Sequence, residues 1–395
     1  MTETHAPERD LPSLDKTLEE GHGLTPPAPP EYREATGWAD AEEVRTTTSP
    51  IGSPLVVVDT EERVHILWAE DGWLWHMYRT QDGWTEPKRL FMGVQPSVDV
   101  DAHGFIHMAF IHDFGGRYQV YYTTFRDPLW AIPYDISRTP GLSQHPALLA
   151  APNGLIYVVW EDDTPGFSSI YHAYNPEGHW INAPVPGARG WRPTLTHDHN
   201  GQIHLIWEGA MPTRQGDDIY HSQLSKDGWT LPENISDSPN RDSAAPTAAP
   251  AQNGMVHVVW QERLGQRSVI GYAFGQYASW RKPLALSAPG THQMPSIVTS
   301  PHGYVHALWT EETAILHRSR GPVADAVWHT PEKVTHQEHP IVSLRAHCDS
   351  EGRVHLVWVT RGEKTWTLHY RWREPAMKHK HFIPTVGVGG GGNAP

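Results

Sequence analysis

The chain repeats one alternation of turn, polar and apolar residues seven times. In each copy a turn residue, usually glycine, precedes a β-branched residue, a histidine, two apolar residues and a closing aromatic ring. The clearest copies end at Trp207, Trp260 and Trp358, and the others at Trp68, Phe110, Trp160 and Trp309. Successive copies lie 42 to 53 residues apart. Short runs of β-branched and aromatic residues between turn residues predict strands, and a period of about 40–50 residues with several such runs is typical of a β-propeller blade.

Three further strands are predicted in each repeat. The first opens eight residues before the turn glycine, at a proline, whose fixed φ suits extended chain. These first strands open at Pro54, Pro96, Pro146, Pro193, Pro246 and Pro295, with Leu344 in the seventh repeat. A third strand follows the copy that ends in the aromatic residue, and it carries an aromatic residue or histidine in its middle. The fourth, outer strand is predicted to open at Trp84, Trp130, Trp180, Trp229, Trp280 and Trp328.

Only six outer tryptophans follow the seven third strands, and the seventh stands near the front of the chain, at Trp38. The 16 residues from Trp38 to Pro54 match the 12 to 17 found in the other repeats. Residues near 38–46 are therefore predicted to form the outer strand of the last blade, which removes exposed sheet edges. The sequence predicts an all-β, seven-bladed β-propeller of four-stranded antiparallel blades, closed by an N-terminal strand pairing into the last blade.

The predicted propeller spans residues 37–373, and the two ends differ in composition. Residues 1–36 are polar and proline-rich, and residues 374–395 pass from a basic run to a glycine run. Such segments stay extended and solvated unless a partner orders them. We expect them to be flexible arms, and a protein partner is predicted to bind through them.

The phrase Asp-x-x-Gly-x-Val-His-Val-Val-Trp-x-Glu, followed by Ile-Tyr-Tyr/His, Asp-Gly-Trp and Ile-Ser, resembles the repeats of sialidase-superfamily (BNR-like) propellers over about residues 37–373. The family's Ser-x-Asp-x-Gly-x-Thr-Trp box is absent. A working sialidase, the resemblance implies, needs three convergent arginines, a tyrosine nucleophile assisted by a glutamate, and an aspartate acid/base. Arginines in suitable strands and loops are Arg117, Arg192, Arg263, Arg345 and Arg361. The first inner strand carries no arginine and no tyrosine is evidently paired with a glutamate, so the catalytic set is incomplete.

Composition excludes several classes of function. The net charge is −14 without a long basic run, which disfavours nucleic acid as a partner. A single cysteine, Cys348, excludes a disulfide framework, and neither a metal site nor a cofactor is predicted. No secretory signal and no run of about 18 apolar residues is present, so no membrane span is expected and a cytoplasmic location is the default expectation.

The chain has 27 histidines, and six of them occupy the same position in the second strand of a repeat. These are His65, His107, His204, His257, His306 and His355, with Tyr157 in the third repeat. Equivalent positions on neighbouring blades are too far apart to share a metal ion. We expect these imidazoles to be buried between blades, neutral and hydrogen-bonded, so that stability falls as the pH drops through about 6.

A site is expected where the repeat is broken. The residues that precede the strand-opening position vary between the blades, and serine alone occurs twice: Ser53, Gln95, His145, Arg192, Ala245, Met294 and Ser343. Ligands usually meet a propeller at the mouth of its channel, and we take the ligand-binding candidates to be Gln95, His145, Trp191, Arg192, Arg263, Met294 and Arg345. Acidic candidates in the loops after the second strands are Glu161, Asp162, Glu208, Glu262 and Glu311. Their near-regular recurrence favours a structural role first.

The sequence favours a non-catalytic binding or scaffolding module, a subunit of a larger assembly. One alternative is a sialidase-like glycoside hydrolase or lyase at the channel mouth. Another is a lectin that binds glycans on tryptophan platforms, at Trp191 or near Trp73 and Trp75.

Overall fold

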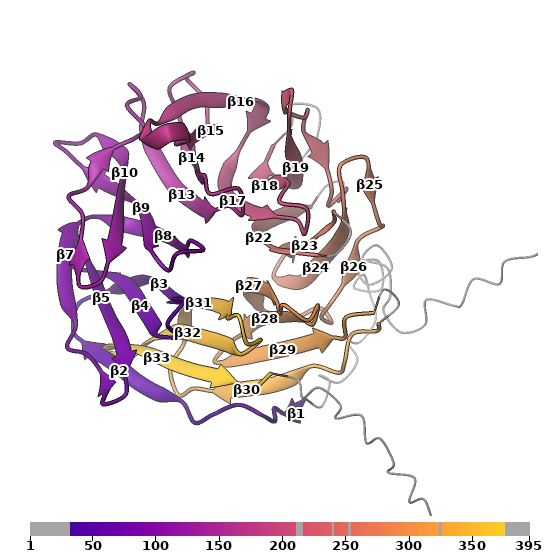
Figure 1. The fold of residues 1–395 in the computed structure, drawn as a ribbon. Coiled ribbons are helices and arrows are strands. Elements are labelled where there is room, and N and C mark those ends of the chain that lie inside the picture. The colour runs from indigo at the N-terminus through magenta and orange to yellow at the C-terminus, as the bar shows by residue number, and fades with distance from the viewer. Residues whose placement is uncertain (1–31, 211–215, 239–240, 252–253, 324–325, 376–395) are drawn as a thin grey trace, which may run out of the picture.

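The computed structural model describes residues 32–210, 216–238, 241–251, 254–323 and 326–375, and these form seven sheets arranged as a ring (Figure 1). Each sheet is one blade, and each interior blade strand pairs antiparallel with its neighbours. The seven-bladed, all-β propeller predicted from the repeat is therefore confirmed. Within the described part of the chain, no helix is long and apolar enough to cross a membrane.

Blades 1 to 4 follow one another along the chain. Blade 1 contains β3 (Ile51–Val58), β4 (Val64–Glu70), β5 (Trp73–Thr80), β6 (Gly83–Trp84) and β7 (Lys88–Met92). Blade 2 contains β8 (Val94–Val100), β9 (Ile106–Asp113), β10 (Tyr118–Arg126), β11 (Leu129–Trp130) and β12 (Tyr134–Asp135). Blade 3 contains β13 (Ser143–Ala150), β14 (Ile156–Asp162), β15 (Ser169–Tyr174) and β16 (Ile181–Arg189), with a 3-10 turn at Pro176–Gly178. Blade 4 contains β17 (Trp191–His197), β18 (Ile203–Gly209), β19 (Asp218–Ser225), β20 (Gly228–Trp229) and β21 (Glu233–Asn234).

Blades 5 to 7 complete the ring. Blade 5 contains β22 (Asp242–Pro250), β23 (Val256–Leu264), β24 (Arg267–Gln276), β25 (Ser279–Trp280) and β26 (Leu284–Ala285). Blade 6 contains β27 (His292–Thr299), β28 (Val305–Glu311), β29 (Ala314–Arg320) and β30 (Glu332–His336). Blade 7 contains β31 (Ile341–Cys348), β32 (Val354–Arg361), β33 (Trp366–Arg373) and, from the front of the chain, β2 (Glu42–Thr47).

The two ends of the described chain close the ring in blade 7. Strand β2 pairs antiparallel with β33, and a further bridge joins Trp38 to Arg373. This confirms the predicted closure by residues near 38–46. The pattern did not predict β1 (Arg33–Glu34), which pairs in parallel with β30 of blade 6. The chain thus binds the edges of two neighbouring blades in succession, starting inside the segment expected to be a flexible arm.

The outer edge is less regular than predicted. In blades 1, 2, 4 and 5 the outer tryptophan lies in a two-residue strand at a hairpin, and a second short strand pairs further along the same neighbour. In blades 1 and 4 the turn glycines, Gly83 and Gly228, have φ of 114° and 107°, which only glycine adopts without strain. The tryptophan therefore ends a tight turn and does not open one continuous strand.

The core lies between blades and explains the repeated aromatic residues. The second-strand tryptophans are fully buried, as in Trp68 and Trp260. Each outer tryptophan packs edge-on against a ring in the third strand of the preceding blade, with centroids 4.8 to 5.7 Å apart and planes at 65° to 89°. The seven pairs are Trp84–Tyr370, Trp130–His76, Trp180–Tyr122, Trp229–His172, Trp280–His221, Trp328–Tyr272 and Trp38–His317. Such T-shaped pairs stabilise by about 0.5–1.5 kcal/mol beyond burial, so Trp38 supplies the seventh contact of a complete ring.

Candidate functional site at the channel mouth

The inner strands carry a bulge at the residues that differ most between blades. Six residues that precede the strand-opening proline have φ between 47° and 53°: Ser53, Gln95, His145, Arg192, Ala245 and Met294. The register of the inner strand shifts at each of them. A following proline disfavours the right-handed helical conformation, and a bulge redirects the side chain that it carries. The seventh blade has Leu344 in place of proline, and Ser343 lacks the positive φ.

These bulged residues line a cavity of about 460 Å³ to which all seven blades contribute. Of the residues predicted to bind a ligand, six lie in its wall: Gln95, His145, Arg192, Arg263, Met294 and Arg345. Trp191 is half-buried and does not line the cavity. Two lining residues that the sequence reasoning missed are Gln261 and Gln293. Gln293 adjoins a bulged residue, and Gln261 follows the second-strand tryptophan, so both positions could have been found from the repeat.

The charge of the cavity is positive although the protein is acidic overall. Arg192 donates from Nη1 to Oε2 of Glu208 at 3.2 Å. Within the described residues, Arg263 and Arg345 form no ion pair with a carboxylate. Water reaches Arg345, yet desolvation by the protein atoms around it lowers the pKa of its guanidinium. The charge of Arg263 acts on Asp217 and opposes the rise in the pKa of that carboxyl, whereas Arg345 donates to the Leu344 carbonyl.

A histidine in the cavity wall, His145, pairs with a glutamate, Glu161, that does not itself line the cavity. His145 Nδ1 lies 2.9 Å from Oε2 of Glu161, and the His145 amide donates to Oε1 of Gln95 in the preceding blade at 2.8 Å. The contact with Glu161 fixes the imidazole orientation. Together these contacts bring three of the predicted residues into one network.

The acidic candidates separate into two groups. Asp162 and Glu262 each accept the indole N–H of the tryptophan two residues earlier, at 3.0 and 2.9 Å. Burial raises the pKa of Glu262, which also accepts two serine hydroxyls. Glu311 accepts the Tyr32 hydroxyl at 2.9 Å. These three carboxylates hold the scaffold, whereas Glu161 and Glu208 orient residues of the cavity.

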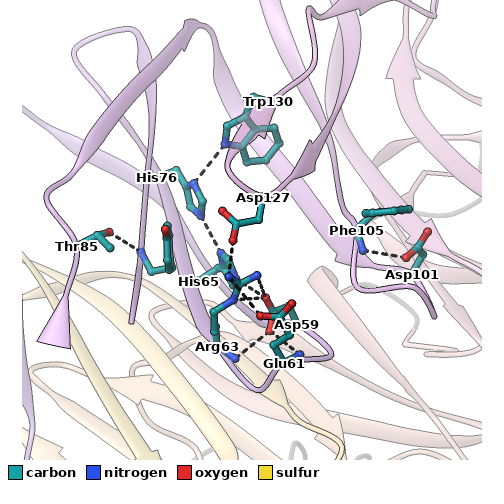
Figure 2. Close-up of polar contacts among 11 residues, drawn as sticks. Asp59, Glu61, Arg63, His65, His76, Thr85, Asp101, Phe105, Asp127 and Trp130 are labelled. Carbon is teal, nitrogen blue, oxygen red and sulfur yellow. Dashed lines mark hydrogen bonds and ion pairs between the residues drawn. The ribbon is translucent and has the colours of Figure 1, made fainter. Parts of the chain in front are cut away.

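The buried histidines belong to the scaffold, as their repetition predicts. In six blades Nδ1 of the second-strand histidine lies 2.6 to 3.0 Å from a histidine or tyrosine of the third strand. In blade 1 Trp130 donates to His76 Nδ1, His76 contacts His65 at 2.9 Å, and His65 Nε2 meets Asp59 at 3.1 Å (Figure 2). Because the indole can only donate, both imidazoles carry their proton on Nε2. Desolvation lowers the pKa of His204 to about 4 and of His257 to about 3, so both are neutral.

The remaining site predictions lie elsewhere. Among the candidate arginines, Arg117 and Arg361 do not line the cavity, and the Arg361 guanidinium lies over the Trp366 ring. Trp73 and Trp75 are covered by the guanidinium groups of Arg89 and Arg45. Most of the terminal arms proposed to bind a partner, residues 1–31 and 376–395, lies outside the described residues.

Comparison with known proteins supports the fold alone. No family model and no curated protein matches the chain. A solved ulvan lyase of polysaccharide lyase family PL25, bound to -[GlcA(1-4)Rha3S]-, matches 82% of this chain and 95% of its own with a TM-score of 0.57 and 9% identity. The polysaccharide lyase Uly1 matches 92% of this chain and 95% of its own (TM-score 0.55, 10% identity). A protein of unknown function from Dyadobacter fermentans matches 86% of this chain and all of its own (TM-score 0.54, 13% identity). The fold expected from the resemblance to sialidase-type propellers is thus confirmed.

Proposed function

We propose that this propeller is a non-catalytic binding protein that holds an acidic saccharide in the cavity at the channel mouth. The observation that carries the proposal is the pair Arg263 and Arg345, which line the cavity and form no ion pair with a carboxylate among the described residues. Guanidinium groups bind carboxylate and sulfate oxygens through paired hydrogen bonds. A cavity of 460 Å³ also falls within the usual range for small-ligand sites.

The lining favours binding over glycoside hydrolysis. None of the described residues that line the cavity is a tyrosine, an aspartate or a glutamate. A hydrolase with two carboxylates, or with a tyrosine nucleophile, needs such groups beside the scissile bond. Glutamine, serine and threonine side chains line the cavity with the arginines, and they suit hydrogen bonds to sugar hydroxyls.

The saccharide class is chosen from the charge of the cavity and from one structural neighbour. The ulvan lyase was solved with a saccharide whose units are written GlcA and Rha3S, which carry a carboxylate and a sulfate. Arg263 and Arg345 can each donate paired hydrogen bonds to a carboxylate or a sulfate group. Binding to a protein partner through the terminal arms remains a second, separate proposal.

One observation favours a catalytic alternative, a lyase. The Glu161 carboxylate orients His145 in the same cavity as the arginines. The imidazole of His145 would take the C5 proton of a uronate whose carboxylate is neutralised by arginine. The electron pair of that C–H bond would form the C4–C5 double bond as the C4–O bond breaks, and the leaving oxygen would take a proton from water.

Calorimetric titration with the -[GlcA(1-4)Rha3S]- oligosaccharide tests the proposal. Binding is expected to weaken by about tenfold or more in the double variant R263Q/R345Q, because charged hydrogen bonds contribute about 1.5–3 kcal/mol each. Arg126→Gln is the matched control, since Arg126 is exposed and does not line the cavity. Equal affinity in the double variant, or no binding at all, would overturn the proposal. An unsaturated uronate product that disappears in H145A would establish the lyase instead.

A further inference from the structure

A second cavity, of about 350 Å³, lies at the opposite ends of the inner strands. In blade 5 the channel-mouth cavity touches Ala245 near the start of β22, whereas the second cavity touches Pro250 at its end. In blades 6 and 7 Thr299 and Cys348 occupy the equivalent places at the ends of β27 and β31. The two cavities share none of their lining residues.

This second cavity coincides with a break in the repeat. In blades 1, 2, 4 and 7 the turn after the inner strand begins with an aspartate that accepts backbone amides two and four residues later. Blades 3, 5 and 6 have Ala151, Ala251 and Ser300 at this position, and the two in adjacent blades, Ala251 and Ser300, line the cavity. The loss of two carboxylates from adjacent blades leaves space and removes negative charge at one place.

The histidine beside the break also lacks its usual acidic partner. In blade 7 Nε2 of His355 meets Asp349 at 3.0 Å. His257 of blade 5 lines the cavity, and its Nδ1 meets the Tyr272 hydroxyl at 2.8 Å. Among the described residues no hydrogen-bond partner of its Nε2 is found. A neutral imidazole nitrogen is therefore available to a ligand in this cavity.

Two arginines and an aromatic ring form one wall. The guanidinium carbons of Arg281 and Arg320 lie 5.7 and 6.0 Å from the centre of the Phe274 ring. Arg320 already donates to the Tyr272 hydroxyl and the Val323 carbonyl. The Phe274 ring also stacks on the imidazole of His257, with the two ring centroids 4.7 Å apart. The carboxylate that lines the cavity, Asp349, is already held by an ion pair with Arg353 at 2.6 Å. The wall is thus cationic beside an aromatic surface.

The remainder of the lining is largely apolar, with Pro250, Met255, Pro301, Pro322 and Val305. Apolar walls bury a flat hydrocarbon surface, while a few placed polar groups fix its orientation. Cations beside an aromatic ring bind one anionic group of the ligand.

We propose that this second cavity binds a small amphipathic anion, an apolar ring system that carries one carboxylate, phosphate or sulfonate group. The anionic group meets the exposed guanidinium of Arg281, and the ring system lies among Phe274 and the prolines. The site is independent of the saccharide site proposed at the channel mouth.

Fluorescence titration with anilinonaphthalene sulfonate, compared with the uncharged phenylnaphthylamine, tests the site. The protein is expected to bind the sulfonate about tenfold more tightly than the uncharged ring system, a difference typical of one charged contact. Arg281→Gln is expected to remove this preference. Arg281 is exposed and its guanidinium lies over the Phe274 ring, so the variant should fold. Arg126→Gln is the matched control, because Arg126 is an exposed arginine over another phenylalanine ring, that of Phe105.

Two further variants locate the probe. Ser350→Trp, at an exposed lining position, is expected to weaken binding of both probes. Arg345→Gln, at the channel mouth, is expected to leave both unchanged, which separates this result from any result on the saccharide. Displacement of the sulfonate by naphthoate or naphthyl phosphate supports the site, and the stronger competitor assigns the anionic group. An unchanged preference in R281Q, unchanged binding in S350W, or displacement by neither competitor overturns the proposal.

Discussion

The outer part of each blade repeats the same side chains around the ring, whereas the bulge of the inner strand carries a different side chain from blade to blade. At the outer part the same contact recurs in all seven blades: a tryptophan edge-on to a histidine or tyrosine of the preceding blade. At the bulge of the inner strand the backbone recurs in six blades, but the side chains are all different. Recurring side chains stabilise the ring, and the side chains that differ define what the channel can bind. Changes to the first group should therefore alter stability, and changes to the second should alter binding.

Loss of the closing strand should have the largest effect. A chain that begins at Ser49 lacks β1, β2 and the Trp38–His317 contact, and leaves the edge of β33 unpaired. We expect a loss of about 5 kcal/mol or more, comparable with the whole stability of a domain, measured by denaturant unfolding against a chain that begins at Tyr32. A peptide of residues 32–48 added in trans should restore part of the loss. Equal stability of the two chains would show that the ring does not depend on this closure.

Removal of one recurring ring from a blade core should have the next largest effect. Trp260→Ala should destabilise by about 3–5 kcal/mol, because it leaves a cavity and deprives buried Glu262 of the indole N–H. Trp260→Phe, which keeps most of the volume, should cost less. Thermal unfolding measures both, and an equal cost in the two variants would contradict the packing argument.

Acid should lower the stability of the folded protein, because the buried second-strand histidines resist protonation. His204 and His257 have pKa values of about 4 and 3 in the folded protein, both lowered by desolvation, against about 6.5 in the unfolded chain. The unfolded state therefore binds more protons, and the free energy of unfolding falls as the pH drops below about 6.5. At pH 5 each of these imidazoles should cost about 2 kcal/mol. The melting temperature at pH 5 is expected to lie below that at pH 7.5, and equal values would contradict this account.

Substitution of a channel residue should have the smallest effect on stability. Arg345→Gln removes a water-exposed guanidinium that has no ion pair among the described residues. We expect the free energy of unfolding to change by about 0.5 kcal/mol or less, as for other exposed positions. A larger loss would place Arg345 among the residues that hold the ring together.

The fold could be predicted because the sequence pattern of one four-stranded blade occurs seven times along the chain. The strand-opening prolines predicted the first strands, and the seven copies that end in an aromatic residue predicted the second strands and the number of blades. Trp38 predicted the closing strand. The two-residue strand β1 gave no periodic signal, because a pairing this short depends on its neighbour in space. Six of the seven residues predicted to bind a ligand line the mouth cavity, and the seventh, Trp191, precedes the bulged residue Arg192 and does not line it.

The second cavity could not be predicted from the chain alone. Ala251 and Ser300 depart visibly from the Asp-x-x-Gly turn, but each departure is 49 residues from the other in sequence. Only the packing of blades 5 and 6 brings them to one wall, together with Arg281 and Arg320. Departures in a repeat are therefore informative when they fall in adjacent blades.

The positive-φ bulges hold the backbone in one conformation at six positions of the channel, while the side chain at each position varies. Each bulged residue is followed by a proline and flanked by paired strand residues, so its backbone direction is set without help from its own side chain. A mutation such as Gln95 to another polar residue would then change the chemistry presented to the channel while the ring keeps its shape. Propellers built in this way can acquire new ligands by single substitutions at six equivalent positions.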